Sequence, residues 1–185
     1  MDADCHINNG ITSQPEVLSE KTFAEFFAGI GLMRIGLERE GWKVVFANDI
    51  ALDKYLMYTE HFHDAKSHFV HDDIHNLKAD DIPAVTLATA SFPCNDLSLA
   101  GACKGLGGAQ SSAYWGFVRI LEKMGDRRPP IVLLENVLGF LSSHEGRDFQ
   151  AALLALNRLG YAVDPMIIDA VRFVPQSHSY DLLKQ

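Results

Sequence analysis

Two residues capable of covalent chemistry follow two short apolar runs in the sequence. Cys94 comes directly after Pro93, shortly beyond the run at 85–90, and Glu135 directly follows the run at 131–134. Short apolar runs of this kind are typical of strands in a buried parallel sheet. Ligands of open parallel sheets bind outside the carboxyl ends of the strands. We therefore expect this thiol and this carboxyl group to act on one substrate, as nucleophile and acid.

A glycine turn adds a possible ligand site. Residues 22–27 favour a strand, and they lead through Gly29, Ile30 and Gly31 to residues 32–40, whose apolar positions 32, 33, 36 and 37 share one helical face. Glycines at such a turn let the backbone approach a ligand closely. Asp49 stands 20 residues after Gly29, the offset at which an acid binds ribose hydroxyls in nucleotide-binding folds. A plain strand-to-helix turn is the alternative, and Asp49 favours the ligand site.

In chain order, these residues resemble the motifs of the DNA cytosine-5 methyltransferases. The resemblance extends from about residue 21 to 177. It rests on Phe27–Gly31, Asn48–Ile50, Asp73–Ile74, Phe92–Cys94, Glu135–Val137 and Val174–Ser177. Each motif is short, but their conjunction at these separations is specific. One departure is Asn95, which stands where most of the family has glutamine.

The resemblance implies S-adenosylmethionine as the methyl donor. It places Phe27 against the adenine or methionine side, Asp49 on the ribose, and Asp73 with Ile74 at the adenine edge. The remaining motif positions that it assigns to the cofactor site are Gly29, Ile30, Gly31, Ile50 and Pro93.

The resemblance also implies roles for the two reactive residues. Cys94 would add to carbon 6 of cytosine, which makes carbon 5 nucleophilic, and Glu135 would protonate nitrogen 3. The apolar run at 131–134 offers the low-dielectric setting that keeps a carboxyl group protonated. The alternatives are an inert buried cysteine at 94 and a simple helix N-terminal charge at 135.

The alternation of helical and strand-like segments predicts an α/β fold. Further helices are expected at 52–63, 112–124 and 147–159, strands at 131–134 and 161–169, and a mobile lid at 101–112. We expect a mostly parallel sheet with helices on both faces, the Rossmann-like methyltransferase fold, incomplete at the C-terminus. Residues 1–20 are expected to be a flexible tail and residues 21–185 a single, truncated catalytic domain.

Charge and composition bear on the partners. The net charge is −8, with 15 acidic against 7 basic residues in 1–81 and 9 of each in 82–185. Duplex DNA with a flipped cytosine, the partner that the resemblance implies, binds mainly through Lys and Arg, so the second half is the better candidate. The three cysteines and eight histidines form no metal-ligand pattern, and no apolar stretch is long enough for a membrane span. We expect a bacterial cytoplasmic protein acting on DNA, with no metal.

The last residues depart from the family pattern. Family members continue past Pro-Gln-Ser with paired arginines, whereas this chain has His178 and Tyr180. The expectation is a frameshift product, an engineered cut or one half of a split enzyme, whose complementary C-terminal chain would carry target recognition. Two other functions stay open: an RNA cytosine-5 methyltransferase of the same family, and an inactive remnant that acts as a binding module.

Overall fold

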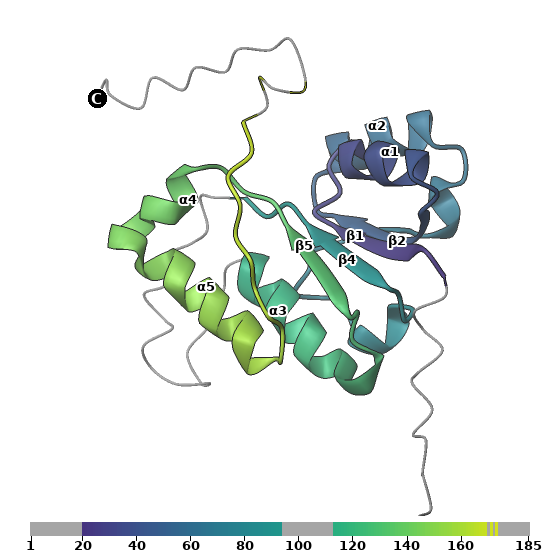
Figure 1. The fold of residues 1–185 in the computed structure, drawn as a ribbon. Helices are drawn as coiled ribbons and strands as arrows, with labels where there is room; N and C mark the ends of the chain where they lie inside the picture. The colour runs from purple at the N-terminus through teal and green to yellow at the C-terminus, as the bar shows by residue number, and fades with distance from the viewer. Residues whose placement is uncertain (1–19, 94–112, 170, 172, 174–185) are drawn as a thin grey trace, which may run out of the picture. The chain divides into compact units, whose positions relative to one another are not determined.

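The computed structural model describes residues 20–93, 113–169, 171 and 173. These residues form two compact units (Figure 1). The first unit comprises residues 20–92 and 115–135. The second comprises Pro93, residues 113–114 and the described residues from 136 onward.

The first unit is built on a parallel sheet. Its strands are β1 (Thr22–Phe26), β2 (Lys43–Asp49), β3 (Phe69–His71), β4 (Leu87–Ala90) and β5 (Ile131–Leu134), in the spatial order β3-β2-β1-β4-β5. Every neighbouring pair is parallel, so the carboxyl ends of all these strands lie along one edge. The strand order reverses between β1 and β4. This reversal is the switch point at which open α/β sheets bind ligands.

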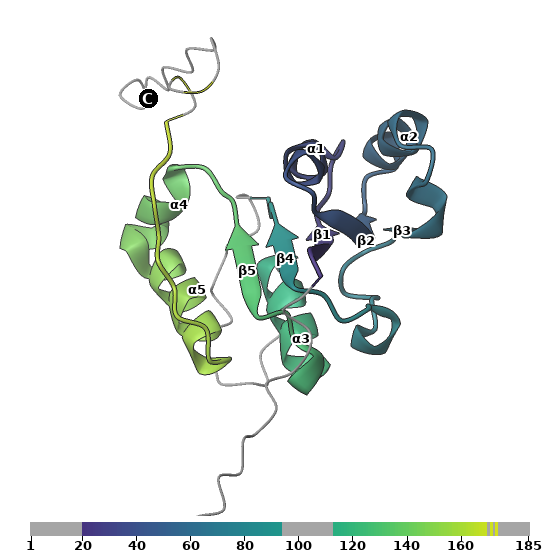
Figure 2. The ribbon, with the colours of Figure 1, turned by 45° about the vertical axis from the view of Figure 1, so that its right-hand side comes forward.

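Helices cover both faces of this sheet (Figure 2). α1 (Leu32–Arg39) and α2 (Leu52–His61) cover one face, and α3 (Ala113–Met124) covers the other. On the first face Phe23 packs in a buried cluster with Tyr58. On the second face the ring centroids of Phe26 and Phe117 lie 5.0 Å apart. Because strand side chains alternate between faces, β1 supplies both cores.

The second unit contains a pair of helices joined by a tight turn. These are α4 (Gly139–Ser142), a 3₁₀ turn at Ser143–Gly146, and α5 (Arg147–Arg158). Asp148, at 1% exposure, accepts a hydrogen bond from the Ser143 hydroxyl through Oδ2, and the same oxygen lies 2.7 Å from His144 Nδ1. His144 has φ of 47°, a left-handed conformation that is uncommon outside glycine. The buried carboxylate therefore holds the connection between the two helices.

Most elements match the sequence prediction, with one correction. The α/β class, the parallel sheet and the helices on both faces are confirmed. The predicted strand at 161–169 is wrong, since these residues pair with no strand in the described part of the chain. The helix after the glycine turn is confirmed. Of the apolar positions that share one face, Leu37 packs against the core, whereas Leu32 is 70% exposed, and the buried Arg34 is only 4% exposed. The lid predicted at 101–112 lies outside the described residues.

Candidate functional site

The glycine turn lies at the switch point, between β1 and α1. Three of its residues, Phe27, Gly29 and Gly31, have φ of 56°, 55° and 83°. Left-handed φ is costly for a residue with a Cβ, so Phe27 carries backbone strain of the kind found at ligand sites. A hydrogen bond from Ala28 N–H to the Asn48 carbonyl, 2.9 Å long, holds the turn against the end of β2.

Asp49, the last residue of β2, fastens the turn from the neighbouring strand. Its Oδ2 accepts the backbone N–H of Gly29 at 2.8 Å, and its Oδ1 accepts that of Ala51 at 2.8 Å. The carboxylate is thereby held at the carboxyl edge of the sheet. Ile30 and Ile50, which follow Gly29 and Asp49 in the sequence, are 40% and 62% exposed, so both apolar side chains are accessible from solvent.

The segment after β3 supplies the third side of the site. Asn48 Nδ2 donates to the carbonyls of Val70 at 2.9 Å and Asp72 at 2.8 Å, which fixes this segment to the end of β2. Asp73 is half-buried, and its Oδ1 accepts the N–H of His75 at 2.9 Å. Ile74 is buried. The predicted residues at 27–31, 49–50 and 73–74 thus lie at or shortly after the ends of three adjacent strands, β1, β2 and β3.

These residues fit a nucleoside-containing cofactor. Gly31, the residue before α1, has no side chain that could cap the helix. The positive N-terminal end of α1 therefore lies next to the turn without a cap from this residue. A Cβ on Gly29 would meet nothing within 4 Å, so there is open space beside that residue. Each oxygen of Asp49 accepts one backbone N–H and keeps a lone pair for a ligand hydroxyl.

Comparison with known proteins identifies the family. The family model for C-5 cytosine-specific DNA methylase matches residues 21–178. The chain belongs to the C-5 cytosine-specific DNA methylase family. It is 37% identical over 155 residues to the type II methyltransferase M.DsaV of Dactylococcopsis salina, a match that covers 83% of this chain and 42% of that protein. It is 35% identical over 156 residues to M.BsuFI of Bacillus subtilis, covering 84% and 36%. This DNA methylase chain thus spans less than half the length of these relatives.

Solved structures show the same fold for this DNA methylase chain. The methyltransferase EhMeth of Entamoeba histolytica aligns with a TM-score of 0.63 and 19% identity, over 83% of this chain and 48% of that one. A mutant DNMT2 of Spodoptera frugiperda aligns with a TM-score of 0.56 and 24% identity, over 75% and 42%. The chain has the Rossmann-like fold of S-adenosylmethionine-dependent methyltransferases.

Of the expected catalytic pair in the DNA methylase chain, the structure describes only Glu135. Cys94 lies outside the described residues, and Pro93 before it is exposed. Glu135 follows β5, and its N–H donates to the Ala90 carbonyl at the end of β4, 3.1 Å away. The strands that precede Cys94 and Glu135 are thus neighbours, in register from Leu87 and Ile131 onward.

The apolar setting predicted around Glu135 is not formed by the described residues. The Glu135 side chain is exposed, and of the run before it Ile131 and Leu133 are 48% and 44% exposed. β5 is the last strand of the described sheet, so one of its edges has no neighbouring strand there. An apolar run can therefore be solvent-exposed when its strand lies at the edge of a sheet.

Three polar residues near the candidate site were not predicted from the sequence. Glu25 and Arg34 are 2% and 4% exposed, and the Arg34 N–H lies 3.3 Å from Glu25 Oε1. Arg119 of α3 donates to the Ile74 carbonyl at 2.9 Å, which supports the segment after β3 from the other face. A charged residue within a strand that precedes a glycine turn was the one available signal, and it pointed to Glu25.

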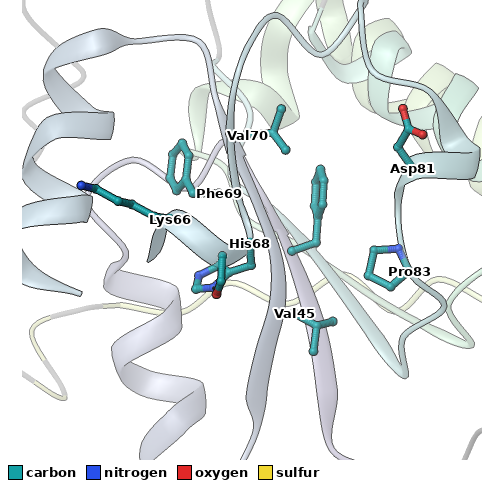
Figure 3. Close-up of a pocket in the computed structure, with 9 residues that line it drawn as sticks. Val45, Lys66, His68, Phe69, Val70, Asp81 and Pro83 are labelled. Carbon is teal, nitrogen blue, oxygen red and sulfur yellow. The ribbon is translucent and has the colours of Figure 1, made fainter. Parts of the chain in front are cut away.

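A pocket of about 290 Å³ lies elsewhere in the same unit (Figure 3). Its lining comes from β2, from the start of β3 with the residues before it, and from the segment ahead of β4. The lining residues are Val45, Phe46, Lys66, Ser67, His68, Phe69, Val70, Asp81 and Pro83. None of them belongs to the glycine turn or the predicted cofactor set, so this pocket is separate from the candidate site.

The described part of the chain contains neither a metal-binding cluster nor a membrane-spanning helix. No cluster of three or more His, Cys, Asp or Glu side chains there is arranged to hold a metal ion. No helix within those residues combines the length and the apolar character that crossing a bilayer requires.

Proposed function

We propose that the chain is the catalytic portion of an enzyme that transfers a methyl group from S-adenosylmethionine to carbon 5 of cytosine in DNA. The hydrogen bond between Gly29 N–H and the Asp49 carboxylate carries the proposal, because it joins a hydroxyl-binding acid to a glycine turn at the switch point of the sheet. The relatives are type II methyltransferases by name, which supports a role in restriction and modification.

S-adenosylmethionine supplies an electrophilic methyl group when it is bound. Asp49 accepts hydrogen bonds from the ribose hydroxyls, and Phe27 and Ile50 flank the adenosine with apolar surface. Asp73 and the neighbouring Ile74, which is buried, bind the adenine edge. The half-burial of Phe27, Asp49 and Asp73 supports these roles, since each side chain is partly covered yet still accessible to a ligand.

The reaction uses Cys94 as a nucleophile. Its thiolate forms a bond to carbon 6 of the cytosine while Glu135 donates a proton to nitrogen 3, and carbon 5 thereby becomes nucleophilic. A bound donor would supply the methyl group to carbon 5, with the donor's sulfur as the leaving group. Removal of the carbon 5 proton by a base expels the thiolate, and the proton on nitrogen 3 returns to Glu135, which restores the ring. The parallel pairing of β4 with β5 supports this division of roles, because it makes the strand ends before Cys94 and Glu135 neighbours.

Recognition of a DNA target belongs in this proposal to additional polypeptide. The relatives M.DsaV and M.BsuFI are more than twice as long as the segment that matches them. In the second unit Met166, Ile167 and Ile168 are 73%, 70% and 64% exposed, and consecutive exposed apolar residues are typical of a surface that further protein covers. His178 and Tyr180, which stand where the resemblance expects paired arginines, lie outside the described residues.

Calorimetry tests the cofactor assignment. The chain is titrated with S-adenosylmethionine and, separately, with a nicotinamide dinucleotide, which glycine turns of this kind also bind in other folds. We expect binding of S-adenosylmethionine, weakened in Asp49→Ala. Preferential binding of the dinucleotide would overturn the assignment.

Covalent trapping tests the substrate. DNA and RNA oligonucleotides with 5-fluorocytosine are incubated with S-adenosylmethionine and the chain, alone or with the C-terminal portion of M.DsaV. Fluorine at carbon 5 cannot leave as a proton does, so the adduct persists. We expect trapped DNA in the completed mixture, and none with Cys94→Ala. Trapping of RNA alone would identify the RNA-acting alternative, and trapping of neither would favour an inactive binding module.

A further inference from the structure

Gly31, the last residue of the glycine turn, packs tightly against α2 and the residue that follows it. A Cβ at Gly31 would lie 2.4 Å from Cε2 of Phe62 and 2.9 Å from Cε2 of Tyr58, closer than real Cβ atoms approach. The position of the turn therefore depends on where these two rings lie. Their own centroids are 4.7 Å apart, so the rings also support each other.

Arg34 of α1 contacts the same two rings. Its guanidinium carbon lies 3.9 Å from the Phe62 ring centroid and 5.5 Å from that of Tyr58, within the range of cation–π attraction. Its Nη1 also lies 3.4 Å from the Tyr58 hydroxyl oxygen. One buried cation thus contacts both rings on which Gly31 rests.

The guanidinium is fixed by acids on two elements. Nη2 donates to both oxygens of Asp64, at 2.8 and 2.9 Å, and Nε donates to Glu38 at 2.9 Å. Burial alone would raise the pKa of Asp64, but the hydrogen bonds and charge of Arg34 outweigh it and lower the pKa. Nη1 also lies 3.3 Å from His68 Nε2. A planar fork with several oriented donors suits this set, which an ammonium could not reproduce.

The main chain of Arg34 is tied to β1 as well. Its N–H lies 3.3 Å from Oε1 of Glu25, two residues before Phe27 in the turn. Arg34 therefore connects the strand before the turn, the helix after it, and the connection from α2 to β3 that carries Asp64.

We propose that Arg34 is a positioning residue for the cofactor: its guanidinium holds the Phe62 and Tyr58 rings, and these rings hold the glycine turn in its ligand-binding shape. The inference rests on the proposed use of the turn for S-adenosylmethionine. Arg34 itself makes no contact with a ligand in this proposal. Its loss loosens the turn and weakens cofactor binding.

A matched control exists in the same unit. Arg127 donates to the carbonyls of Ile82 at 2.9 Å and Ala79 at 2.8 Å and pairs with Asp80 at 3.3 Å. These three partners precede β4 and do not belong to the glycine turn. Arg34→Met and Arg127→Met each replace an arginine that joins separate segments with a neutral side chain of similar length. Only the first is expected to affect the turn selectively.

Amide hydrogen exchange on the chain without cofactor separates local from global effects. The amides of Gly29 and Gly31, both hydrogen-bonded in the turn, are compared with that of Ala88 in β4. In Arg34→Met the turn amides should exchange at least about tenfold faster relative to Ala88, as expected for a local opening. In Arg127→Met the ratio should stay unchanged. An equal change at all three amides in Arg34→Met would show that Arg34 only stabilises the fold.

A milder pair covers the possibility that Arg34→Met fails to fold. Asp64→Asn and Asp80→Asn each remove one acid from an arginine, and both acids are largely exposed, at 59% and 95% for their side chains. The turn amides should exchange faster in Asp64→Asn and not in Asp80→Asn. The same response in both variants would overturn the proposal.

Cofactor binding gives the second readout. Arg34→Met and Asp64→Asn should raise the Kd for S-adenosylmethionine, and Asp80→Asn should not. If the wild-type chain bound no S-adenosylmethionine, the proposed function would fail while the exchange data would still decide the role of Arg34. If it bound and Arg34→Met left the Kd unchanged, the positioning role would be refuted alone.

Discussion

Asp49 Oδ2 and the backbone N–H of Gly29 form a hydrogen bond of 2.8 Å across the ends of β2 and β1. The second oxygen of the same carboxylate accepts the N–H of Ala51, so both oxygens are oriented without a ligand. Groups that are already ordered lose less conformational entropy on binding. The glycine turn thus positions the acid that is predicted to bind the ribose.

Replacing Asp49 should weaken cofactor binding. Asp49→Ala removes the proposed acceptor for the ribose hydroxyls and one anchor of the turn, at a cost of about 1.5–3 kcal/mol in binding free energy, the range for hydrogen bonds to charged groups. Asp53→Ala, on the exposed side of α2, is the control and should bind normally. Equal affinities for the wild type and Asp49→Ala in calorimetry would remove Asp49 from the site.

A methyl group at Gly31 should be far more harmful than one at Gly36. Gly31→Ala places a Cβ against Phe62 and Tyr58 at φ of 83°, so about 1–3 kcal/mol of stability should be lost. Gly36→Ala, within α1, meets nothing within 4 Å and should stabilise the chain by up to about 1 kcal/mol. Urea unfolding of both variants decides this, and similar midpoints would contradict the packing of the turn.

Cys94 should be the one essential thiol of the completed enzyme. Cys94→Ala should abolish methyl transfer because no nucleophile remains to activate carbon 5. Cys103→Ala and Cys5→Ala should keep activity within a few-fold of wild type. Incorporation of labelled methyl groups measures all three, and an active Cys94→Ala enzyme would exclude the covalent mechanism.

Glu135 should contribute to the rate and not to cofactor binding. Glu135→Gln keeps the shape and removes the transferable proton, so the single-turnover rate should fall by roughly 10²–10⁴-fold, the usual contribution of general acid catalysis. The Kd for S-adenosylmethionine should remain as in the wild type. A wild-type rate would instead assign Glu135 a structural role at the end of β5.

Glu25 should make the stability of the chain depend on pH. Burial is the main cause that raises its pKa from 4.5 to about 7, although the N–H and charge of Arg34 oppose the shift. Because the folded state holds this proton more tightly, the contribution of Glu25 is fully present below about pH 4.5 and is lost as the pH rises to about 7. At 1.36 kcal/mol per pKa unit, the loss is on the order of 3 kcal/mol.

The test is urea unfolding of Glu25→Gln and wild type between pH 4 and 8. The variant should lack the fall in stability that the wild type shows over this range. His68 acts in the opposite direction, since burial lowers its pKa from 6.5 and its contribution is lost as the pH falls. His68→Asn therefore serves as the control and should steepen the fall. Parallel wild-type and Glu25→Gln profiles would show that the buried acid does not titrate in this range.

The sequence predicted the parts of the fold that depend on local signals. The strand at 131–134 and the helix at 147–159 were predicted correctly, because the composition of the first segment and the period of the second are local signals. The strand expected at 161–169 failed because a strand also requires a partner, which the described residues do not supply to this segment. Its apolar composition, including Met166 and Ile167, carried no information about pairing.

In the candidate site, too, residues with a local sequence signal were predicted and residues that depend on tertiary contacts were not. Gly29 and Asp49, the predicted cofactor residues, were chosen from motif spacing, and the structure joins them by a hydrogen bond. Arg34 was missed because a lone arginine in an amphipathic helix is normally solvent-exposed. Its burial depends on Asp64, 30 residues further along the chain. Such tertiary pairs leave no local pattern.

The strand order also governs how the chain can fold during synthesis. β1 lies between β2 and β4, so Phe23 pairs with Val44 on one side and with Leu87 on the other. The second edge of β1 therefore stays uncovered until Leu87 has been synthesised. A parallel sheet offers no hairpin from which pairing could start, and each new strand closes a long loop. A nascent chain arrested before residue 87 would therefore expose one edge of its central strand, with Phe23 and Ala24 open to chaperones and to other unfinished chains.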